Sequence, residues 1–547
     1  MRSTMMDVPL TVTAIMRYGT TAYRDSEVVT LTSTGTRRQS YAATGARVAQ
    51  LANALRALGV DGDQRVATLM WNNSEHLEAY LAIPSMGAVL HTLNLRLDPH
   101  VIGYIADHAG DDVVIVDPTL VPLLAQVLPY APAIRHIIVT AAENETEFVR
   151  PAELAADGRP VHSYEALLAA QSATFDWSEP DERSAAAMCY TSGTTGHPKG
   201  VVYSHRSMHL HSMAVCMNGV FGLSEEDRVL PVVPMFHANA WGLPYAAILC
   251  GADLVMPDRF LQPEPLVRLI EAERPTLAGA VPTIWNGLLQ HIRAHGGDLS
   301  SLRVVPCGGS AVPHSLMEAY EKELGVFIMQ AWGMTETSPL GSVARPPAGL
   351  TVDEGWRYRD SAGRLMCQVE HRLVGEGGVI LPCDGEAVGE IEVRGPWVTG
   401  AYYKDDDPDK FRDGWLRTGD VGTIDQLGFV NLTDRAKDVI KSGGEWISSM
   451  ELENLLMAHP QVTEAAVIGI ADDKWGERPL AGVVVAEGST VTAAELREFL
   501  AGQVPRWQLP ERWCFIDEVP KTSVGKFAKT KMRDAYARGD YEVIEAR

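Results

Sequence analysis

Several features that would place this chain in a common class are missing from its 547 residues. No run of eighteen apolar residues occurs, so we expect no membrane-spanning helix. The first twenty residues lack the apolar core and the cleavage site of a secretion signal. Lysine and arginine (47) are outnumbered by aspartate and glutamate (70). The resulting net charge of −23 argues against non-specific binding to nucleic acid or to anionic membranes.

Cysteine is also scarce, and it shows no pattern of pairing. The seven cysteines are odd in number and scattered, and no two form a C-x-x-C pair. Most lie in apolar segments, which is typical of reduced cysteines in a protein core. The missing signal and these cysteines together predict a cytoplasmic protein. The 46% share of hydrophobic residues is that of a globular chain with ample core.

Two familiar nucleotide-binding loops are absent, namely the Walker A pattern G-x-x-x-x-G-K-[ST] and the dinucleotide pattern G-x-G-x-x-G. A different loop, TSGTTGHPKG at 191–200, combines glycines, hydroxyls and Lys199. Glycine lets backbone N–H groups turn toward a phosphate, and the hydroxyls and the lysine add hydrogen bonds and charge. The sequence therefore predicts a phosphate-binding loop, and the alternative is a solvated polar loop.

Alternating helical and strand patterns predict an α/β fold for most of the chain. This alternation covers residues 46–140 and again about 185–340, whereas residues 345–434 are richer in glycine and read as short strands. Ser448 and Thr492 begin capping boxes of helices in a final α+β unit. We therefore predict an N-terminal domain (1–434) of two α/β subdomains plus a small β-rich subdomain, and a mobile α+β C-terminal domain (435–547). The short charged segment 433–438 suits a hinge.

Four motifs occur in a fixed order along the whole chain: the loop at 191–200, QAWGMTE at 330–336, RTGD at 417–420, and Lys526 in PKTSVGK. Together they resemble the adenylate-forming superfamily of acyl-CoA synthetases, luciferases and peptide-synthetase adenylation domains. The strings PMFHANAWGLPY (234–245) and DVIKSGGEWISSMELEN (438–454) are most similar to medium- and long-chain fatty acyl-CoA ligases. A ligase of methylthio-propionate carries very similar strings. The resemblance implies an AMP-forming fatty acid:CoA ligase that uses ATP, Mg²⁺ and CoA.

The resemblance also assigns a nucleotide site. Trp332 supplies a flat face for adenine, Thr335 donates to the α-phosphate, and Asp420 accepts from the ribose hydroxyls with Arg435 as its partner. Glu336 is a hard oxygen ligand for Mg²⁺. The implied metal ligands are Glu336 and Thr191. The implied nucleotide-binding residues are Thr191, Ser192, Gly193, Thr194, Thr195, Gly196, Lys199, Gly309, Ser310, Gln330, Trp332, Gly333, Asp420 and Arg435.

Lys526 matches the family's catalytic lysine, whose charge would offset the charge that builds up when a carboxylate attacks the α-phosphate. Thr335, Glu336 and Lys441 complete the implied catalytic set. Lys437 matches the hinge position about which the C-terminal domain turns. Gly443 and Gly444 lie in a loop that would leave room for the pantetheine arm of CoA.

The acyl site is implied to include His237 and Trp241. A satisfied core histidine and a core tryptophan remain the alternatives at these two positions. His205, His209 and His211 lack the carboxylate of an H-E-x-x-H metal site, so polar helix residues are favoured there. The acidic run Asp405–Asp407 reads as a solvated loop.

Alternative functions remain open from the sequence. A short acid such as a methylthio-alkanoate, or an aryl acid, differs from a fatty acid only in the depth of pocket that it requires. Transfer to a carrier protein is less favoured, because no carrier domain follows Lys526. A catalytically dead binder is disfavoured, because Glu336, Asp420 and Lys526 are all present. The expected partners are a carboxylic acid, ATP and CoA, without nucleic acid, and a homodimer stays open.

Overall fold

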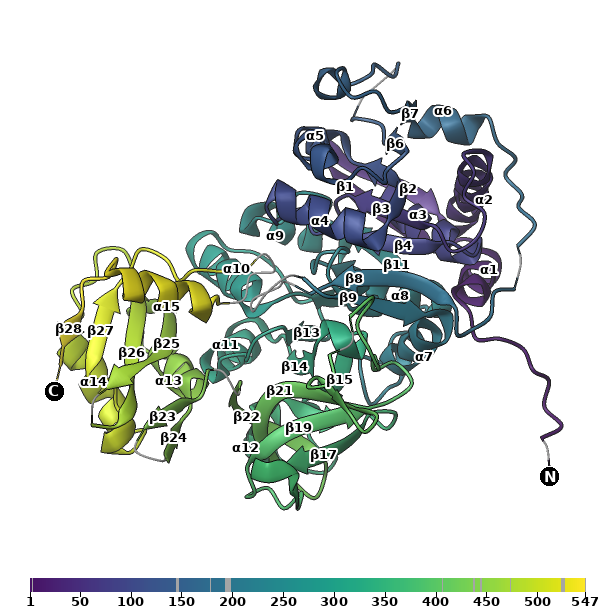
Figure 1. Cartoon of the computed structure of the whole chain (residues 1–547). Coiled ribbons are helices and arrows are strands. Elements are labelled where there is room, and N and C mark those ends of the chain that lie inside the picture. Colours follow the sequence, from purple (N-terminus) through teal and green to yellow (C-terminus); the bar gives the residue numbers. More distant parts are fainter. Residues whose placement is uncertain are drawn as a thin grey trace.

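The structure is a computed structural model of the chain. It describes all residues except 2, 144–146, 178, 192–197, 406, 436–437, 443–444, 473, 523–526 and 547, and only the backbone at 435, 445 and 446. Figure 1 shows a large N-terminal region, coloured purple to green, and a smaller C-terminal domain, coloured light green to yellow, beside it.

The first sheet of the N-terminal region is parallel except at its β8–β9 edge. Its strand order is β7 (Val161–Ser163), β6 (His136–Val139), β5 (Asp111–Val116), β3 (Arg65–Leu69), β4 (Val89–Thr92), β8 (Ala185–Tyr190) and β9 (Gly200–Ser204). The second sheet is parallel except for its β1–β2 hairpin. Its order is β12 (Leu277–Gly279), β10 (Arg228–Pro231), β11 (Asp253–Met256), β1 (Glu27–Thr32) and β2 (Gly35–Ser40).

Helices pack between and outside these sheets (Figure 1). They are α1 (Val12–Ala22), α2 (Tyr41–Ala57), α3 (Ser74–Ser85), α4 (Pro99–Ala109), α5 (Val121–Val127), α6 (Tyr164–Ala169), α7 (His205–Cys216), α8 (Leu243–Cys250), α9 (Pro263–Glu273), α10 (Pro282–His295) and α11 (His314–Ala319). Helix α3 contacts β1 of one sheet and β3, β4 and β8 of the other, and every one of its residues is buried. A helix buried on all sides needs no polar face, so α3 belongs to the core.

The β-rich part forms one continuous sheet that begins earlier than the sequence indicated. Its order is β13 (Val305–Gly308), β14 (Ile328–Gly333), β15 (Leu340–Val343), β16 (Gly363–Leu365), β22 (Phe429–Arg435), β21 (Trp415–Ile424), β19 (Gly389–Arg394), β17 (Glu370–Val374) and β18 (Ile380–Leu381), while β20 (Phe411–Arg412) pairs with β21. Helix α12 (Val352–Arg359) interrupts it in sequence. In this sheet β13 pairs with β14 in parallel, and β14 pairs with β15 antiparallel. The last strands of the α/β region and the strands of the β-rich region therefore belong to the same sheet.

The C-terminal domain is an α+β unit. Its sheet has the order β24 (Glu445–Ile447), β23 (Ile440–Ser442), β26 (Gly476–Val485), β27 (Arg512–Phe515) and β28 (Ile544–Glu545), and β25 (Val462–Asp472) also pairs with β26. Its helices are α13 (Ser449–Met457), α14 (Ala493–Ala501) and α15 (Lys529–Arg538). Thr492 forms the predicted capping box with Glu495. Ser448 caps α13 by accepting from the N–H of Glu451, and its own hydroxyl donates to the carbonyl of Thr433. The predicted fold class is confirmed.

Candidate active site

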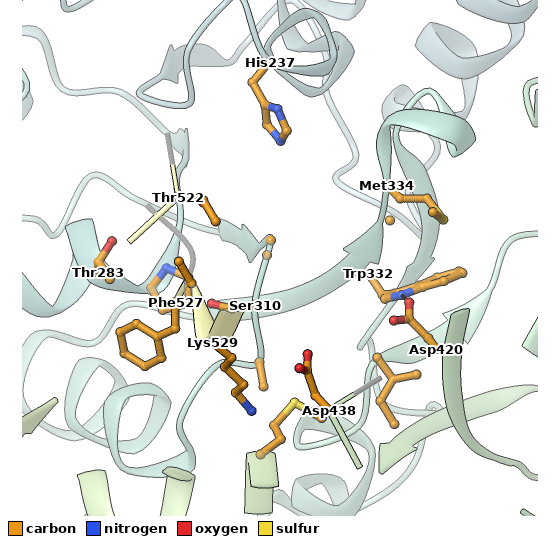
Figure 2. Close-up of a pocket in the computed structure, with 18 of the residues that line it drawn as sticks. His237, Thr283, Ser310, Trp332, Met334, Asp420, Asp438, Thr522, Phe527 and Lys529 are labelled. Atoms are coloured by element: carbon orange, nitrogen blue, oxygen red, sulfur yellow. Dashed lines mark hydrogen bonds between the residues drawn. The ribbon is translucent and has the colours of Figure 1, made fainter. Parts of the chain in front are cut away.

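A cavity of about 1760 Å³ lies between the N-terminal region and the C-terminal domain. Its wall includes residues from β13, β14, β21, α10, α11, α13 and the start of α15. Pockets for a single small ligand usually measure about 300–1,000 Å³, so this one has room for more than one molecule. Figure 2 shows side chains from both domains facing this space, with His237 at one end and Asp438 and Lys529 at the other.

One wall carries Trp332 and Asp420, both predicted nucleotide ligands. The indole N–H of Trp332 donates to Oδ2 of Asp420 at 2.8 Å (Figure 2). The backbone N–H of Asp420 donates to Oγ1 of Thr418 at 3.0 Å, which fixes the main chain below the carboxylate. Both Trp332 and Asp420 are only 8% exposed. The wall therefore combines a flat aromatic ring and a carboxylate, which are the groups that a base and a ribose require.

The opposite loop of the predicted adenine site, residues 307–313, is held by Gln330. Its side-chain oxygen accepts from the N–H of Val312 at 2.6 Å, and its side-chain nitrogen donates to the carbonyl of Ser361. Gly309 has φ +88°, a conformation that a side chain would strain. Gly309, Ser310 and Gly333, which the resemblance assigned to the nucleotide, all line the cavity. Gln330 lines it as well, and its hydrogen bonds show that it also supports this loop.

A second wall gathers the predicted phosphate-binding groups. The two ends of the loop at 191–200 are joined, because Thr191 N–H donates to the carbonyl of Lys199 at 2.9 Å. Lys199 N–H donates in turn to Thr191 Oγ1 at 3.1 Å. The Lys199 ammonium contacts Asp407 at 2.6 Å and Asp405 at 3.2 Å. The hydrogen bond from Lys199 lowers the pKa of Asp407, and the same bond raises the pKa of Lys199. The interpretation of 405–407 as a solvated loop was wrong at these two aspartates.

Glu336 lies at this wall beside Thr335, and both are buried and line the cavity. The hydroxyl of Tyr402 donates to Oε1 of Glu336 at 2.6 Å. Burial and the nearby Glu336 raise the pKa of Tyr402, so the phenol remains a donor. Within the described part of the chain, no group of three or more His, Cys, Asp or Glu could hold a metal ion. A Mg²⁺ bound mainly through phosphates and water needs only one or two carboxylates, and Glu336 fits that requirement.

Trp241, one of the two predicted acyl residues, lies on a left-handed turn that the sequence did not reveal, and His237 directly precedes this turn. Ala238, Asn239, Ala240 and Trp241 have φ between +43° and +58°, and Gly242 has φ +72°. A left-handed conformation costs an L-residue about 1–2 kcal/mol, so this turn stores strain that its buried surroundings must maintain. All four residues are buried, and both His237 and Trp241 line the cavity. Glycine would normally signal such a turn, and here it occurs only at the last position.

The C-terminal wall contains an ionic cluster that sequence reasoning missed. The Lys529 ammonium contacts Glu453 at 2.8 Å and donates to Oγ of Ser449 at 2.5 Å. Ser449 N–H donates to Oδ2 of Asp434 at 2.8 Å. Nearby, Arg533 contacts Asp438 at 2.8 Å. Asp434 and Asp438 lie within the predicted hinge segment 433–438, on either side of Lys437, and the described contacts connect them to α13 and α15.

Several predicted residues lie outside the described residues: Ser192, Gly193, Thr194, Thr195, Gly196, Lys437, Gly443, Gly444 and Lys526. The side chain of Arg435 lies outside them too, although its backbone pairs with Asp420 in the sheet. Thr522 and Phe527, which flank residues 523–526, both line the cavity (Figure 2). Lys441 is exposed on β23 and is not among the lining residues.

The three histidines of α7 make contacts with the rest of the domain. His205 Nδ1 accepts from Val12 N–H at 3.2 Å, and His209 Nδ1 lies 3.0 Å from the carbonyl of Thr11. His211 Nε2 accepts from Leu340 N–H at 3.4 Å. These contacts agree with the interpretation as helix residues behind the phosphate loop.

Comparison with known proteins agrees with this geometry over nearly the whole chain. The chain is 42% identical over 536 residues to the 3-methylmercaptopropionyl-CoA ligase of Ruegeria lacuscaerulensis, covering 97% of this chain and 98% of that one. It is 43% identical over 542 residues to the long-chain fatty acid–CoA ligase of Thermus thermophilus, covering 98% and 97%. The crystal structure of an anthranilate CoA ligase in complex with anthranoyl-AMP superposes with a TM-score of 0.86 at 26% identity, covering 98% and 99%.

In the part of the chain that the structure describes, no helix combines the length and the apolar character needed to cross a membrane. Residues 451–526 match the AMP-binding enzyme C-terminal domain, and residues 18–403 match the AMP-binding enzyme domain itself. The chain therefore belongs to the AMP-binding enzyme family of adenylate-forming acyl-CoA ligases.

Proposed function

We propose that this protein activates a medium- or long-chain fatty acid with ATP and transfers the acyl group to CoA. The observation that carries the proposal is the composition of one cavity. A ring and a carboxylate suited to a nucleoside, a lysine and a glutamate suited to phosphates, and an apolar turn suited to an acyl chain all face the same space.

The first half-reaction joins the acid to the nucleotide. The carboxylate oxygen of the acid attacks the α-phosphorus of ATP, and the bond to the β-phosphate oxygen breaks, so acyl-adenylate forms and pyrophosphate leaves. We assign Trp332 to adenine, Asp420 with Arg435 to the ribose, and Thr335 to the α-phosphate. Glu336 and Thr191 would hold Mg²⁺, which when bound neutralises charge on the phosphates. Lys526 would offset the charge on the bridging oxygens.

The second half-reaction releases the product. The CoA thiol attacks the acyl carbonyl carbon, and the bond to AMP breaks, so acyl-CoA and AMP leave. We assign Lys437 to the hinge, and Lys441, Gly443 and Gly444 to the face that then meets the adenylate. We place the boundary between the two domains at 434/435, at the last residue of β22 (Phe429–Arg435), where the segment between Asp434 and Asp438 begins.

A short methylthio-alkanoate is the second candidate substrate, and one observation favours it. The chain is 42% identical to a ligase of 3-methylmercaptopropionate, almost the same identity as to the long-chain ligase. Trp241 lines the cavity, and whether its indole closes a shallow acyl pocket or gates a deeper tunnel would decide between the two substrates. We further propose a cytoplasmic location and a homodimer. Cell fractionation would test the location, and light scattering of the purified protein would test the oligomeric state.

The reaction class can be tested without CoA. Adenylate formation is reversible, so the protein should exchange labelled pyrophosphate into ATP when dodecanoate is present and CoA is not. Adding CoA should then yield dodecanoyl-CoA and AMP in equal amounts. A lack of acid-dependent exchange, or formation of ADP in place of AMP, would contradict the proposed function.

A further inference from the structure

We propose that Trp332 is a positioning residue for Asp420: its indole N–H holds the carboxylate in the orientation that reads the ribose hydroxyls. Recognition of the base and of the ribose would then be coupled through one hydrogen bond. The inference rests on the proposed function, in which Asp420 binds the ribose of ATP.

The hydrogen bond joins two strands that do not pair with each other. Trp332 is in β14 and Asp420 in β21, and β15, β16 and β22 lie between them in the strand order. The 2.8 Å contact between Nε1 and Oδ2 therefore fixes a distance across the curved sheet that no backbone ladder fixes directly. Both side chains are buried, and a buried carboxylate is stabilised by every donor that it keeps.

The indole itself has little freedom to move. A Cβ atom added to Gly341 would lie 2.4 Å from Cζ3 and 2.5 Å from Cε3 of Trp332. The six-membered ring therefore lies directly against the backbone of β15, where only glycine leaves it room. With the ring seated in this way, the direction of its N–H is set before any nucleotide binds.

The carboxylate has capacity for both the indole and a ribose. A carboxylate accepts about four hydrogen bonds, and Trp332 contributes a single donor. The main chain of Asp420 is already fixed by Thr418, so the indole acts on the side-chain orientation alone. Phenylalanine at 332 would keep a ring for stacking and donate nothing. Tyrosine would donate only from the tip of its ring, away from where the indole N–H lies.

The test compares ATP with 2′-deoxyATP and 3′-deoxyATP. Trp332→Phe should raise KM for ATP about 10- to 100-fold, the usual range for losing a hydrogen bond to a charged group, with a smaller change in kcat. Each deoxynucleotide lacks one of the hydroxyls that Asp420 is proposed to bind, so its KM should rise less in Trp332→Phe than the KM for ATP. The preference for ATP over each deoxynucleotide should therefore fall at least about fivefold. In an Asp420→Asn background, Trp332→Phe should have little further effect.

Trp397→Phe is the matched control. Trp397 is also buried, and its indole donates to the carbonyl of Leu340 at 2.9 Å, so this variant loses a similar bond away from Asp420. It should keep the wild-type preference for ATP. Gly341→Ala is a second test, because it displaces the ring and so redirects its N–H without removing that donor, and it should weaken the preference as Trp332→Phe does. Melting temperatures identify variants that fail to fold.

An unchanged preference in both Trp332→Phe and Gly341→Ala would overturn the inference, and so would an equal loss in Trp397→Phe. Calorimetric binding of the same nucleotides separates this result from the proposed function. If no acid supports turnover, the proposed function is contradicted, while the ratio of the Kd values still decides the role of Trp332.

Discussion

Tyr402, Asp405 and Asp407 contact the two charged side chains that are predicted to meet the phosphates, Glu336 and Lys199. Tyr402 donates to Glu336, and Asp405 and Asp407 contact the Lys199 ammonium. This ammonium also lies 4.9 Å from the centre of the Tyr402 ring. The two aspartates therefore keep the lysine charge at the cavity wall before a phosphate arrives. Nucleotide binding at Lys199 would exchange one anion for another.

Tyr402→Phe should impair the use of Mg²⁺. Without the phenol, Glu336 loses the donor that fixes Oε1, so the Mg²⁺ concentration for half-maximal activity should rise about tenfold. A Mg²⁺ titration of pyrophosphate release measures this directly. Tyr403→Phe is the neighbouring control and should keep the wild-type Mg²⁺ dependence. An identical dependence in the wild type and in Tyr402→Phe would show that the phenol does not position Glu336.

Lys526→Ala should lower the rate of adenylation by roughly 10²–10³-fold, because one charge aimed at the bridging oxygens is lost. Thioester formation from supplied acyl-adenylate should change far less. Lys521→Ala is the control from the same segment, since Lys521 pairs with Glu464 at 2.6 Å. If Lys526→Ala lowered the rates of both half-reactions equally, the role assigned to this lysine would be contradicted.

Residues with a family motif around them could be predicted from the sequence, and residues without one could not. Trp332, Thr335, Glu336 and Asp420 were predicted as site residues, and all of them line the cavity. Asp407 and Lys529 were missed, because their partners Lys199 and Glu453 lie far away in the sequence and no spacing rule connects them. The roles of these side chains stay predictions until they are tested.

At the scale of elements, we expect two buried histidines of α7 to make the stability of the protein depend on pH. Burial lowers the pKa of both His205 and His211 to about 4. Histidine in an unfolded chain titrates near 6.5, so between about pH 6.5 and pH 4 the unfolded state binds more protons. The stability from these neutral histidines is fully present above about pH 6.5 and is lost as the pH falls toward 4. Nδ1 of His205 accepts from Val12 N–H, so the neutral ring carries its proton on Nε2. A second proton would go to Nδ1, which would remove this hydrogen bond and place two donors against each other.

His205→Asn should therefore reduce the loss of stability in acid. Each histidine can contribute up to about 1.4 kcal/mol per pH unit within this window. Melting temperatures between pH 7.5 and pH 4.5 should fall less steeply for His205→Asn than for the wild type. His295→Asn, which changes an exposed histidine on α10, is the matched control. If the wild type and His205→Asn have parallel profiles, His205 does not control this transition.

The elements themselves were largely predictable, and their grouping into sheets was not. The alternation over residues 46–140 predicted helices and strands there, and the structure has β5 at Asp111–Val116 as one of these strands. The boundary near 345 was wrong for the sheet, because β13 to β15 join the later strands in one ladder. Strand pairing joins residues far apart in sequence, so local periodicity gives no information on it. The left-handed turn at 238–241 also could not be predicted from local sequence, because its buried surroundings maintain it.

At the scale of the whole molecule, the account depends on movement of the C-terminal domain. Lys437→Pro should separate the two half-reactions, because proline fixes φ near −65° and removes a backbone donor. Acyl-adenylate and pyrophosphate should still form from ATP and acid, whereas transfer to CoA should stall. Rapid-quench measurement of both products follows the two steps separately. Thioester synthesis at the wild-type rate would show that the hinge lies elsewhere or that no rotation is needed.

The most direct test of the central claim is the acyl-CoA product profile of the wild-type protein. Unbranched acids of two to eighteen carbons and 3-methylthiopropionate would each be supplied with ATP, Mg²⁺ and CoA, and kcat/KM measured from acyl-CoA formation. Burial of each added methylene is worth about 0.8 kcal/mol, so kcat/KM should rise severalfold per carbon until the pocket ends. We expect the maximum at about eight to sixteen carbons. A maximum at three to five carbons, with 3-methylthiopropionate among the best substrates, would contradict the fatty-acid assignment.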